Sequence, residues 1–256
     1  MKLQVESLAL GYPGRALARD LGFAITPGQT WAVLGNNGCG KTTLMHALGG
    51  LAPPLRGQVL LDGKPMPEIP RKELARRVAV LTQREDQAFW GSVLDYVLLG
   101  RHPHARSWFG WPAGDEQIAR AHLERMGLAP LAGRAFDTLS GGERQRARIA
   151  LALTQSPAIY LLDEPLQHLD LKHQLETLRL FRSLARNGDC AVVMVLHDLL
   201  WATRYCDHAL LLHDDGSALA GPAPELLTLP RLERLFGCAL QTEGAAGTEH
   251  LVPRDV

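Results

Sequence analysis

The chain has 256 residues, of which 46% are hydrophobic and 21% are charged, a composition that excludes a disordered or fibrous protein. Its 27 Lys and Arg residues equal its 27 Asp and Glu residues, so the formal net charge is +0. The chain as a whole therefore lacks the surplus of cations that attracts nucleic acid, although a local basic patch is compatible with this balance. The length predicts one functional module without an added sensor domain.

The four cysteines, Cys39, Cys190, Cys206 and Cys238, lie far apart and form no C-x-x-C pair. This spacing argues against both a disulfide framework and a structural zinc site. We therefore expect small, buried thiols in a reducing cytosol.

The first residues do not have the profile of a signal peptide. Met1 leads directly into an alternating, strand-like run at residues 2–6. The longest apolar runs, near residues 159–162 and 190–196, fall far short of the ~20 residues that are needed to cross a bilayer. We expect a protein that is not secreted and that can act at a membrane only peripherally.

The first part of the chain alternates between strand and helix patterns. Residues 2–34 predict two or three strands, with turn signals at residues 11–14 and 27–28 and an apolar strand at residues 31–34. A glycine-rich turn follows, and then a helix from residue 42 to residue 51. Residues 58–61 predict a strand that enters an Asp-Gly turn. This part of the chain is therefore expected to be α/β.

A helical segment interrupts this pattern after a strand at residues 78–81. Helical patterns lie around residues 93–99 and 117–126, and residues 102–114 between them are rich in Pro, Gly and Trp. We expect those residues to form a surface loop, because they are too many for a tight turn. Residues 137–154 predict a capped helix.

The short runs at residues 159–162 and 191–196 are almost entirely apolar. Such runs are typical of strands that are buried on both faces of a parallel sheet. The sheet is therefore expected to resume after the helical segment, and residues 241–256 are expected to be a short surface extension.

A glycine-rich loop matches G-x-x-x-x-G-K-[ST] directly between the strand at 31–34 and a helix, which is the context that a phosphate-binding loop requires. The loop comprises Gly35, Asn36, Asn37, Gly38, Cys39, Gly40, Lys41 and Thr42. Its backbone N–H groups can surround phosphate oxygens, and the start of the helix adds positive potential. Lys41 can bridge the outer phosphates, while the Thr42 hydroxyl can bind Mg²⁺.

Two adjacent carboxylates, Asp163 and Glu164, follow the apolar run at residues 159–162. Parallel sheets place ligand sites at the carboxyl ends of their strands, which favours a functional interpretation over a solvated edge or a helix cap. Asp163 is suited to hold Mg²⁺ through its water shell, and Glu164 can polarise the water that attacks the γ-phosphorus.

The run Leu139-Ser140-Gly141-Gly142-Glu143-Arg144-Gln145-Arg146 resembles the signature of the ATP-binding cassette (ABC) family. The resemblance extends from Tyr12 to about Phe236. It implies an α/β P-loop NTPase (RecA-like) core with an N-terminal antiparallel β subdomain and an inserted α-helical subdomain. The ATP-binding domain is then expected at residues 1–240, with the helical subdomain at about 86–155 and a C-terminal tail at 241–256.

In the resembling family, the signature faces the γ-phosphate that is bound by a second cassette, so two chains enclose two ATP molecules head to tail. Ser140 and Gly142 would offer a hydroxyl and backbone N–H donors at the start of a helix. Asp170 resembles the end of the D-loop, which crosses the dimer interface. Gln167 and His168 depart from the commoner Ser-Ala of that loop. The resemblance thus implies a homodimer and poor ATP hydrolysis by a single subunit.

Three further positions match the family one at a time. Gln83 resembles the Q-loop glutamine that senses Mg²⁺ and the attacking water, His197 resembles the switch histidine that binds the γ-phosphate, and Tyr12 resembles the aromatic that stacks on adenine. The resemblance assigns catalysis to Glu164, His197 and Gln83; nucleotide binding to Tyr12, Gly35, Asn36, Asn37, Gly38, Cys39, Gly40, Lys41, Thr42, Thr43, Ser140, Gly141, Gly142 and Asp170; and Mg²⁺ binding to Thr42, Gln83 and Asp163.

Cys39 and the histidines His102 and His104 carry side chains that could have other chemistry. The thiol of Cys39 lies beside a helix N-terminus, which can make it reactive, so we expect alkylation to inhibit ATP binding modestly. His102 and His104 flank a proline and lack further ligands nearby, so we expect no metal site there.

A single cassette without fused membrane spans favours the ATP-binding subunit of an importer. Residues 98–104 and 168–174 resemble the subgroup that energises uptake of ferric siderophores, haem and vitamin B12 (cobalamin), and residues 31–35 and 208–236 weakly favour cobalamin. The resemblance implies membrane permeases as partners, a periplasmic binding protein as an indirect partner, and a peripheral position on the cytoplasmic face of the inner membrane. Residues 83–90, including Arg84, Glu85 and Asp86, would receive a permease helix.

Two alternatives are less favoured. A soluble ABC ATPase that acts on ribosomes or nucleic acid usually has tandem cassettes or long coiled-coil insertions, and this chain has neither. Its neutral charge also offers no obvious surface for a polyanion, so we expect no nucleic acid partner. Exporter cassettes usually carry fused spans and a different pattern before the signature than residues 134–138.

Overall fold

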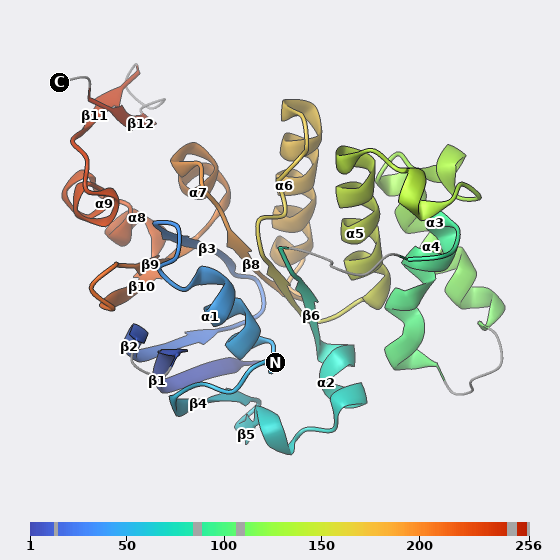
Figure 1. Ribbon diagram of the computed structural model, residues 1–256, viewed down its shortest axis with the longest axis horizontal. Helices are drawn as coiled ribbons and strands as arrows, with labels where there is room; N and C mark the ends of the chain where they lie inside the picture. Colours follow the sequence, from blue (N-terminus) through green and yellow to red (C-terminus); the bar gives the residue numbers. More distant parts are fainter. Residues whose placement is uncertain (13–14, 84–88, 106–110, 245–249, 255–256) are drawn as a thin grey trace.

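The computed structural model describes residues 1–256 except 13–14, 84–88, 106–110, 245–249 and 255–256 (Figure 1). A six-stranded sheet, in the order β10-β9-β3-β8-β7-β6, forms the centre. A four-stranded sheet in the order β2-β1-β4-β5 lies beside it, and β11 pairs with β12. The strands are β1 Leu3–Tyr12, β2 Arg15–Ile25, β3 Thr30–Gly35, β4 Arg56–Leu61, β5 Lys64–Pro65, β6 Val78–Leu81, β7 Ile159–Leu162, β8 Ala191–Val195, β9 His208–Leu212, β10 Ala218–Pro222, β11 Leu240–Glu243 and β12 His250–Pro253.

The central sheet is parallel from β9 to β6, and only β10 at its edge runs antiparallel. Every residue of β3, β7 and β8 is buried. This burial on both faces explains why these strands are almost continuously apolar, and it confirms the parallel sheet predicted from the sequence.

The four-stranded sheet is antiparallel throughout. Residues on one face of β1, including Leu3, Val5, Leu8 and Leu10, are buried, while most intervening residues are partly exposed. One face of this sheet therefore packs on the core while the other contacts solvent. It is the N-terminal antiparallel β subdomain that the family resemblance implies.

The helices form two groups (Figure 1). Figure 1 shows α3 and α4 gathered beside α5, and α6 between α5 and α7. The first group comprises α3 Val93–Leu98, η2 Leu99–His104, α4 Ala113–Arg125, η3 Ala129–Leu131, η4 Phe136–Thr138 and α5 Gly141–Gln155; the remaining helices are α1 Lys41–Leu48, η1 Met66–Glu68, α2 Arg71–Arg77, α6 Leu171–Arg186, α7 Leu199–Tyr205, α8 Ala223–Leu226 and α9 Leu229–Phe236. Among the residues described, none of the helices has the length and apolar character needed to span a membrane.

Three segments differ from the sequence expectations. Helices occupy both ends of the range 102–114, for which a loop was expected, because η2 continues to His104 and α4 begins at Ala113. Pro103 is accommodated in η2 because a short 3₁₀ helix has few backbone hydrogen bonds to lose. The helix expected at residues 137–154 is divided by an extended residue, Ser140, which starts α5. In the expected surface extension, β11 and β12 pair and Leu240 is buried.

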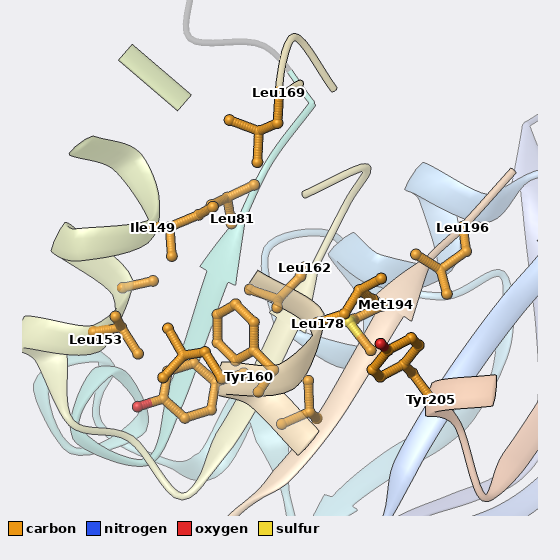
Figure 2. Packing of buried hydrophobic residues seen from close by; sticks show 14 of the residues in the cluster. Leu81, Ile149, Leu153, Tyr160, Leu162, Leu169, Leu178, Met194, Leu196 and Tyr205 are labelled. Carbon is orange, nitrogen blue, oxygen red and sulfur yellow. The ribbon is translucent and has the colours of Figure 1, made fainter. Parts of the chain in front are cut away.

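Two hydrophobic clusters cover the two faces of the central sheet. Along β7, Ile159 and Leu161 belong to the cluster beneath α1, whereas Tyr160 and Leu162 belong to the cluster beneath α5 and α6. Figure 2 shows Tyr160 and Leu162 among Leu153 of α5, Leu178 of α6 and Met194 of β8. This packing fixes β7, and therefore the carboxylates that follow it, against the helical segment.

Phe181 is a fully buried residue of α6, and its ring centroid lies 5.4 Å from that of Tyr160. Phe181→Ala leaves a cavity between α6 and the sheet, so we expect the free energy of unfolding to fall by about 3–5 kcal/mol in urea denaturation. Leu171→Ala, at an exposed position of the same helix, is the control and should change it by less than about 0.5 kcal/mol. Equal values for the two variants would contradict the packing described.

Candidate active site

A cavity of about 600 Å³ opens at the carboxyl ends of the parallel strands. Its lining combines residues from the β1–β2 hairpin, the glycine-rich loop and the segments that follow β6, β7 and β8. The lining residues are Tyr12, Leu17, Asn37, Gly38, Gly40, Lys41, Thr42, Thr43, Gln83, Glu164, Gln167 and His197. The volume is in the range of small-molecule sites.

Residues of the glycine-rich loop place the N-terminus of α1 at this cavity. Gly40 precedes α1 with a φ of +110°, and a Cβ there would lie 2.9 Å from Leu17 Cβ. Both observations require glycine at this position. No side chain caps α1, and its first turn has no acidic residue, so its N-terminal positive potential remains for an anion.

The ammonium group of Lys41 is buried within the same loop. Its Nζ atom donates to the carbonyl oxygens of Gly35 and Asn36, each at 2.8 Å. Within the described ranges, no carboxylate forms an ion pair with Lys41. The positive charge is therefore held in place by dipoles and is not neutralised, as the binding of a phosphate requires.

Asp163 follows β7 and is 1% exposed, and neither of its carboxylate oxygens has a hydrogen-bond partner. Burial raises the pKa of its carboxyl group, while the Thr42 and Lys41 side chains act in the opposite direction. A buried carboxylate without a partner is costly unless a cation compensates it. The oxygens of Asp163 and Thr42 are ligands of the type that Mg²⁺ prefers, so these residues fit that ion.

Glu164 and His197 approach each other across the cavity, with 2.8 Å between Glu164 Oε1 and His197 Nε2. Glu164 has a φ of +51°, a left-handed conformation that is uncommon outside glycine. Such strain is found at functional sites, where the surrounding packing imposes it. The side chain of Glu164 is 14% exposed, so a water molecule beside it would be partly shielded from bulk solvent.

Not all the residues that the sequence singled out lie in the lining. Tyr12, Asn37, Gly38, Gly40, Lys41, Thr42, Thr43, Gln83, Glu164 and His197 line the cavity, whereas Gly35, Asn36, Cys39, Ser140, Gly141, Gly142, Asp163 and Asp170 do not. The side-chain Nδ2 atom of Asn36 donates to Asp214 Oδ2 at 2.8 Å and to the Leu235 carbonyl oxygen at 3.2 Å. These bonds attach the loop to the C-terminal part of the chain.

The signature residues begin α5. Ser140 and Glu143 form a capping box, in which Ser140 Oγ accepts from the Glu143 N–H at 3.3 Å and Glu143 Oε2 accepts from the Ser140 N–H at 2.8 Å. The latter bond lowers the pKa of Glu143. A Cβ at Gly142 would lie 2.9 Å from the His168 carbonyl oxygen, so the signature packs closely on the segment after Glu164.

Asp170 caps the N-terminus of α6, as Ser140 caps that of α5. Its Oδ1 atom accepts from the His173 N–H at 2.9 Å and lies 2.8 Å from His173 Nδ1. The backbone hydrogen bond from His173 lowers the pKa of Asp170. In this structure, the carboxylate of Asp170 therefore acts as a helix cap within its own chain.

Two residues connect these elements: Gln145, which lies within the signature run but was given no role of its own, and Arg148, which the sequence did not single out. Gln145 of α5 donates through Nε2 to the Pro165 carbonyl at 3.0 Å and to the Glu164 carbonyl at 3.4 Å. Its Oε1 atom accepts from Arg148 Nη1 at 3.0 Å, and Arg148 Nη2 donates to the Thr82 carbonyl, directly before Gln83. The helix that carries the signature is thus hydrogen-bonded to the segments that bear Gln83 and Glu164.

Arg84, Glu85 and Asp86, in the segment that was expected to receive a permease helix, lie outside the described residues. Trp90, at the end of the same segment, is 87% exposed. His104 donates to the Gln155 carbonyl at 2.9 Å, a bond that holds η2 against α5.

The chain resembles known proteins over almost its full length. A family model described as ABC transporter matches residues 18–167. The ferric enterobactin transport ATP-binding protein FepC of Escherichia coli (strain K12) is 38% identical, covering 98% of this chain and 94% of that protein. The hemin import ATP-binding protein HmuV of Gloeobacter violaceus is 42% identical, covering 94% of this chain and 88% of that protein. A solved structure of an inward-facing ABC transporter, assigned to the metal-chelate type, has a TM-score of 0.84 at 31% identity and covers 99% of this chain and 97% of that one.

The fold, the phosphate-binding loop and the signature therefore define an ATP-binding cassette. The chain belongs to the ATP-binding subunits of ABC transporters, and it is an ATPase that powers transport. It is similar to FepC and HmuV, which are named for transport of ferric enterobactin and for import of hemin.

The hydrogen bonds of Gln145 are expected to position the segment that bears Glu164. Gln145→Glu keeps the shape of the side chain but places a carboxylate against the Pro165 and Glu164 carbonyls, which disturbs the segment that bears Glu164. We expect kcat for ATP hydrolysis to fall at least about tenfold, with little change in the dissociation constant for ATP. Arg120→Ala, at an exposed site on α4, is the control. An unchanged kcat would show that the hydrogen bonds do not position Glu164.

The structure argues against the expected reactivity of Cys39. The residue is only 4% exposed, and burial raises the pKa of its thiol even though Lys41 lowers it. A buried, protonated thiol is a poor nucleophile. Among the four cysteines, Cys238 alone is exposed, while Cys39, Cys190 and Cys206 are buried as expected, and all four are free.

We therefore predict that maleimide labels the native protein rapidly at Cys238 and much more slowly at Cys39. Mass spectrometry of peptides after timed labelling measures both rates. Cys238→Ser should remove the fast phase and leave ATP hydrolysis unchanged. Fast labelling of Cys39 without unfolding would contradict its burial.

Proposed function

We propose that this chain is the ATP-hydrolysing subunit of an importer for an iron chelate or haem. The observation that supports this most strongly is its match, over almost the full length of both chains, to relatives named for ferric enterobactin transport and hemin import. Neither of these relatives is named for cobalamin, so they give no support to the weak preference for cobalamin in the sequence.

ATP binding follows from the lining of the cavity. Tyr12 is 60% exposed at the rim, where its ring can stack on adenine. The phosphates would then lie along the glycine-rich loop at the N-terminus of α1, with Lys41 exchanging its bonds to loop carbonyls for bonds to phosphate oxygens. Asp163, Thr42 and Gln83 would hold Mg²⁺, which neutralises phosphate charge when bound.

Hydrolysis requires a base and a group that stabilises the γ-phosphate. Glu164 orients a water molecule in line with the bond to be broken and accepts its proton as the water oxygen bonds to the γ-phosphorus. The bond between that phosphorus and the bridging oxygen breaks, and the products are ADP and inorganic phosphate. His197, which contacts Glu164 in this structure, would turn to the γ-phosphate and leave the carboxylate for water.

A second copy of the chain completes the site in this proposal. Ser140, Gly141 and Gly142 begin a helix but do not line the cavity of their own chain. The capping box at the N-terminus of α5 uses the N–H groups of Ser140 and Glu143, so the Ser140 hydroxyl hydrogen and the N–H groups of Gly141 and Gly142 would remain for an anion, and a head-to-tail homodimer would present them to the γ-phosphate of the partner. Asp170 lies on the adjoining D-loop and would approach the same interface.

Closure of this dimer would move a membrane permease. The permease subunits would dock near residues 83–90, where Trp90 is exposed, and a periplasmic binding protein would deliver cargo to them. The chain would then lie at the cytoplasmic face of the inner membrane, with no nucleic acid partner. An ATPase that acts on ribosomes or nucleic acid is the alternative that the experiments below test.

Uptake assays test the cargo. Cells that lack the chain would be supplied with labelled ferric siderophore, haem or cobalamin, with and without a plasmid that encodes it. Restored uptake of a ferric siderophore or haem is the expected result, and the Lys41→Ala variant should restore none. Restoration of cobalamin uptake alone would correct the cargo, and failure with all three would contradict the importer.

Glu164→Gln provides a test of the chemistry. We expect this variant, assembled with its permease, to bind ATP as tightly as the native chain but to hydrolyse it ~10²–10³-fold more slowly, because an amide cannot accept the proton. Lys41→Ala should instead abolish ATP binding, since the ammonium group is the main cation of the site. ATP binding and phosphate release, measured separately, distinguish the two effects. Normal turnover by Glu164→Gln would show that another group is the base.

A further inference from the structure

A second cavity, of about 570 Å³, lies between the C-terminal end of α4, the start of α5 and one face of α6. It shares no lining residue with the nucleotide cavity, and none of the roles assigned above uses it. The residues that line it are Glu124, Arg125, Met126, Gly127, Arg146, Lys172, His173, Glu176, Thr177, Arg179, Leu180 and Ser183.

The lining carries an excess of positive charge. Its four cations, Arg125, Arg146, Lys172 and Arg179, face only two carboxylates, whereas the whole chain has a formal net charge of +0. Cations brought together in a hollow repel one another unless an anion lies between them. The concentration of charge therefore points to an anionic ligand.

Two of these four cations have no partner among the residues that the structure describes. Lys172 and Glu176 form a loose ion pair with 4.0 Å between Nζ and Oε1. Across the parts of the chain that the structure describes, Arg125 and Arg179 form no ion pair or hydrogen bond. Arg146 is fixed by donating through Nη1 to the Met126 carbonyl at 2.8 Å, and its guanidinium has further N–H donors.

An independent observation comes from Thr177, in the wall of the same cavity. This residue of α6 is 1% exposed, and its hydroxyl group has no hydrogen-bond partner. A buried hydroxyl group without a partner is destabilising, and a rotation of the Thr177 side chain toward the cavity would bring it to a ligand oxygen. The cavity thus combines unpaired guanidinium groups with an unpaired neutral donor.

We propose that this cavity binds a small soluble polyanion that carries two or more phosphate groups. Guanidinium groups bind phosphate oxygens through paired N–H donors, and three arginines surround the cavity. Its volume fits a small molecule, and Glu124 and Glu176 at its wall oppose an extended polyanion such as nucleic acid. Because the lining comes from both α4 and α6, the ligand would link the helical segment to the core.

Isothermal titration calorimetry with inorganic pyrophosphate tests this site on the full chain. The Lys41→Ala variant serves as the background, because it removes the main cation of the nucleotide cavity. We expect one remaining pyrophosphate site in this background. Arg125→Ala and Arg179→Ala should each weaken it by about fivefold or more, and Arg120→Ala, an exposed cation outside the lining, should leave it unchanged.

Glu176→Gln should change the affinity for pyrophosphate in the opposite direction. It removes a negative charge from the wall, so we expect tighter pyrophosphate binding by up to about fivefold, a gain that misfolding cannot produce. Loss of all pyrophosphate binding in the Lys41→Ala background would overturn the proposal, as would an affinity that none of the charge variants changes.

Discussion

The buried ammonium group of Lys41 is the interaction on which the site depends. It has carbonyl dipoles as its partners, and it lies at the N-terminus of an uncapped helix, so the loop concentrates positive potential that the protein itself does not neutralise. Asp163 is the complementary case, a buried carboxylate that has no hydrogen-bond partner. Each charge is costly alone, and together they are suited to a phosphate chain with a divalent cation. Burial of β3 and β7 in the central sheet keeps them in place.

The helix α5 connects this chemistry with the rest of the molecule. Its N-terminus carries the signature, and one turn later Gln145 and Arg148 hold the backbone beside Glu164 and Gln83. A ligand that engages the start of α5 would therefore act on the segments that bear both side chains. This arrangement gives a physical route from the closure of two cassettes to hydrolysis, and from hydrolysis back to the position of the helical segment.

Much of the fold and the cavity could be predicted from the sequence, because continuous apolar runs identify buried parallel strands and the loop motif fixes its own geometry. The contacts of Gln145 and Arg148 could not be predicted, since their acceptors are backbone carbonyls distant in the chain, which no motif records. The sequence suggested a reactive Cys39 because its proximity to a helix N-terminus is visible there, whereas its burial, which argues against reactivity, is not. The composition of residues 102–114 favoured a loop, although a 3₁₀ helix tolerates Pro103.

The most direct test of the account is to identify what the chain binds in its own membranes. The Glu164→Gln variant, tagged and extracted in mild detergent with ATP, would be purified and its partners identified by mass spectrometry. The account predicts a second copy of the chain together with a multispanning permease. Ribosomal or DNA-associated proteins without any membrane protein would contradict the importer, while the nucleotide chemistry of the cavity would stand.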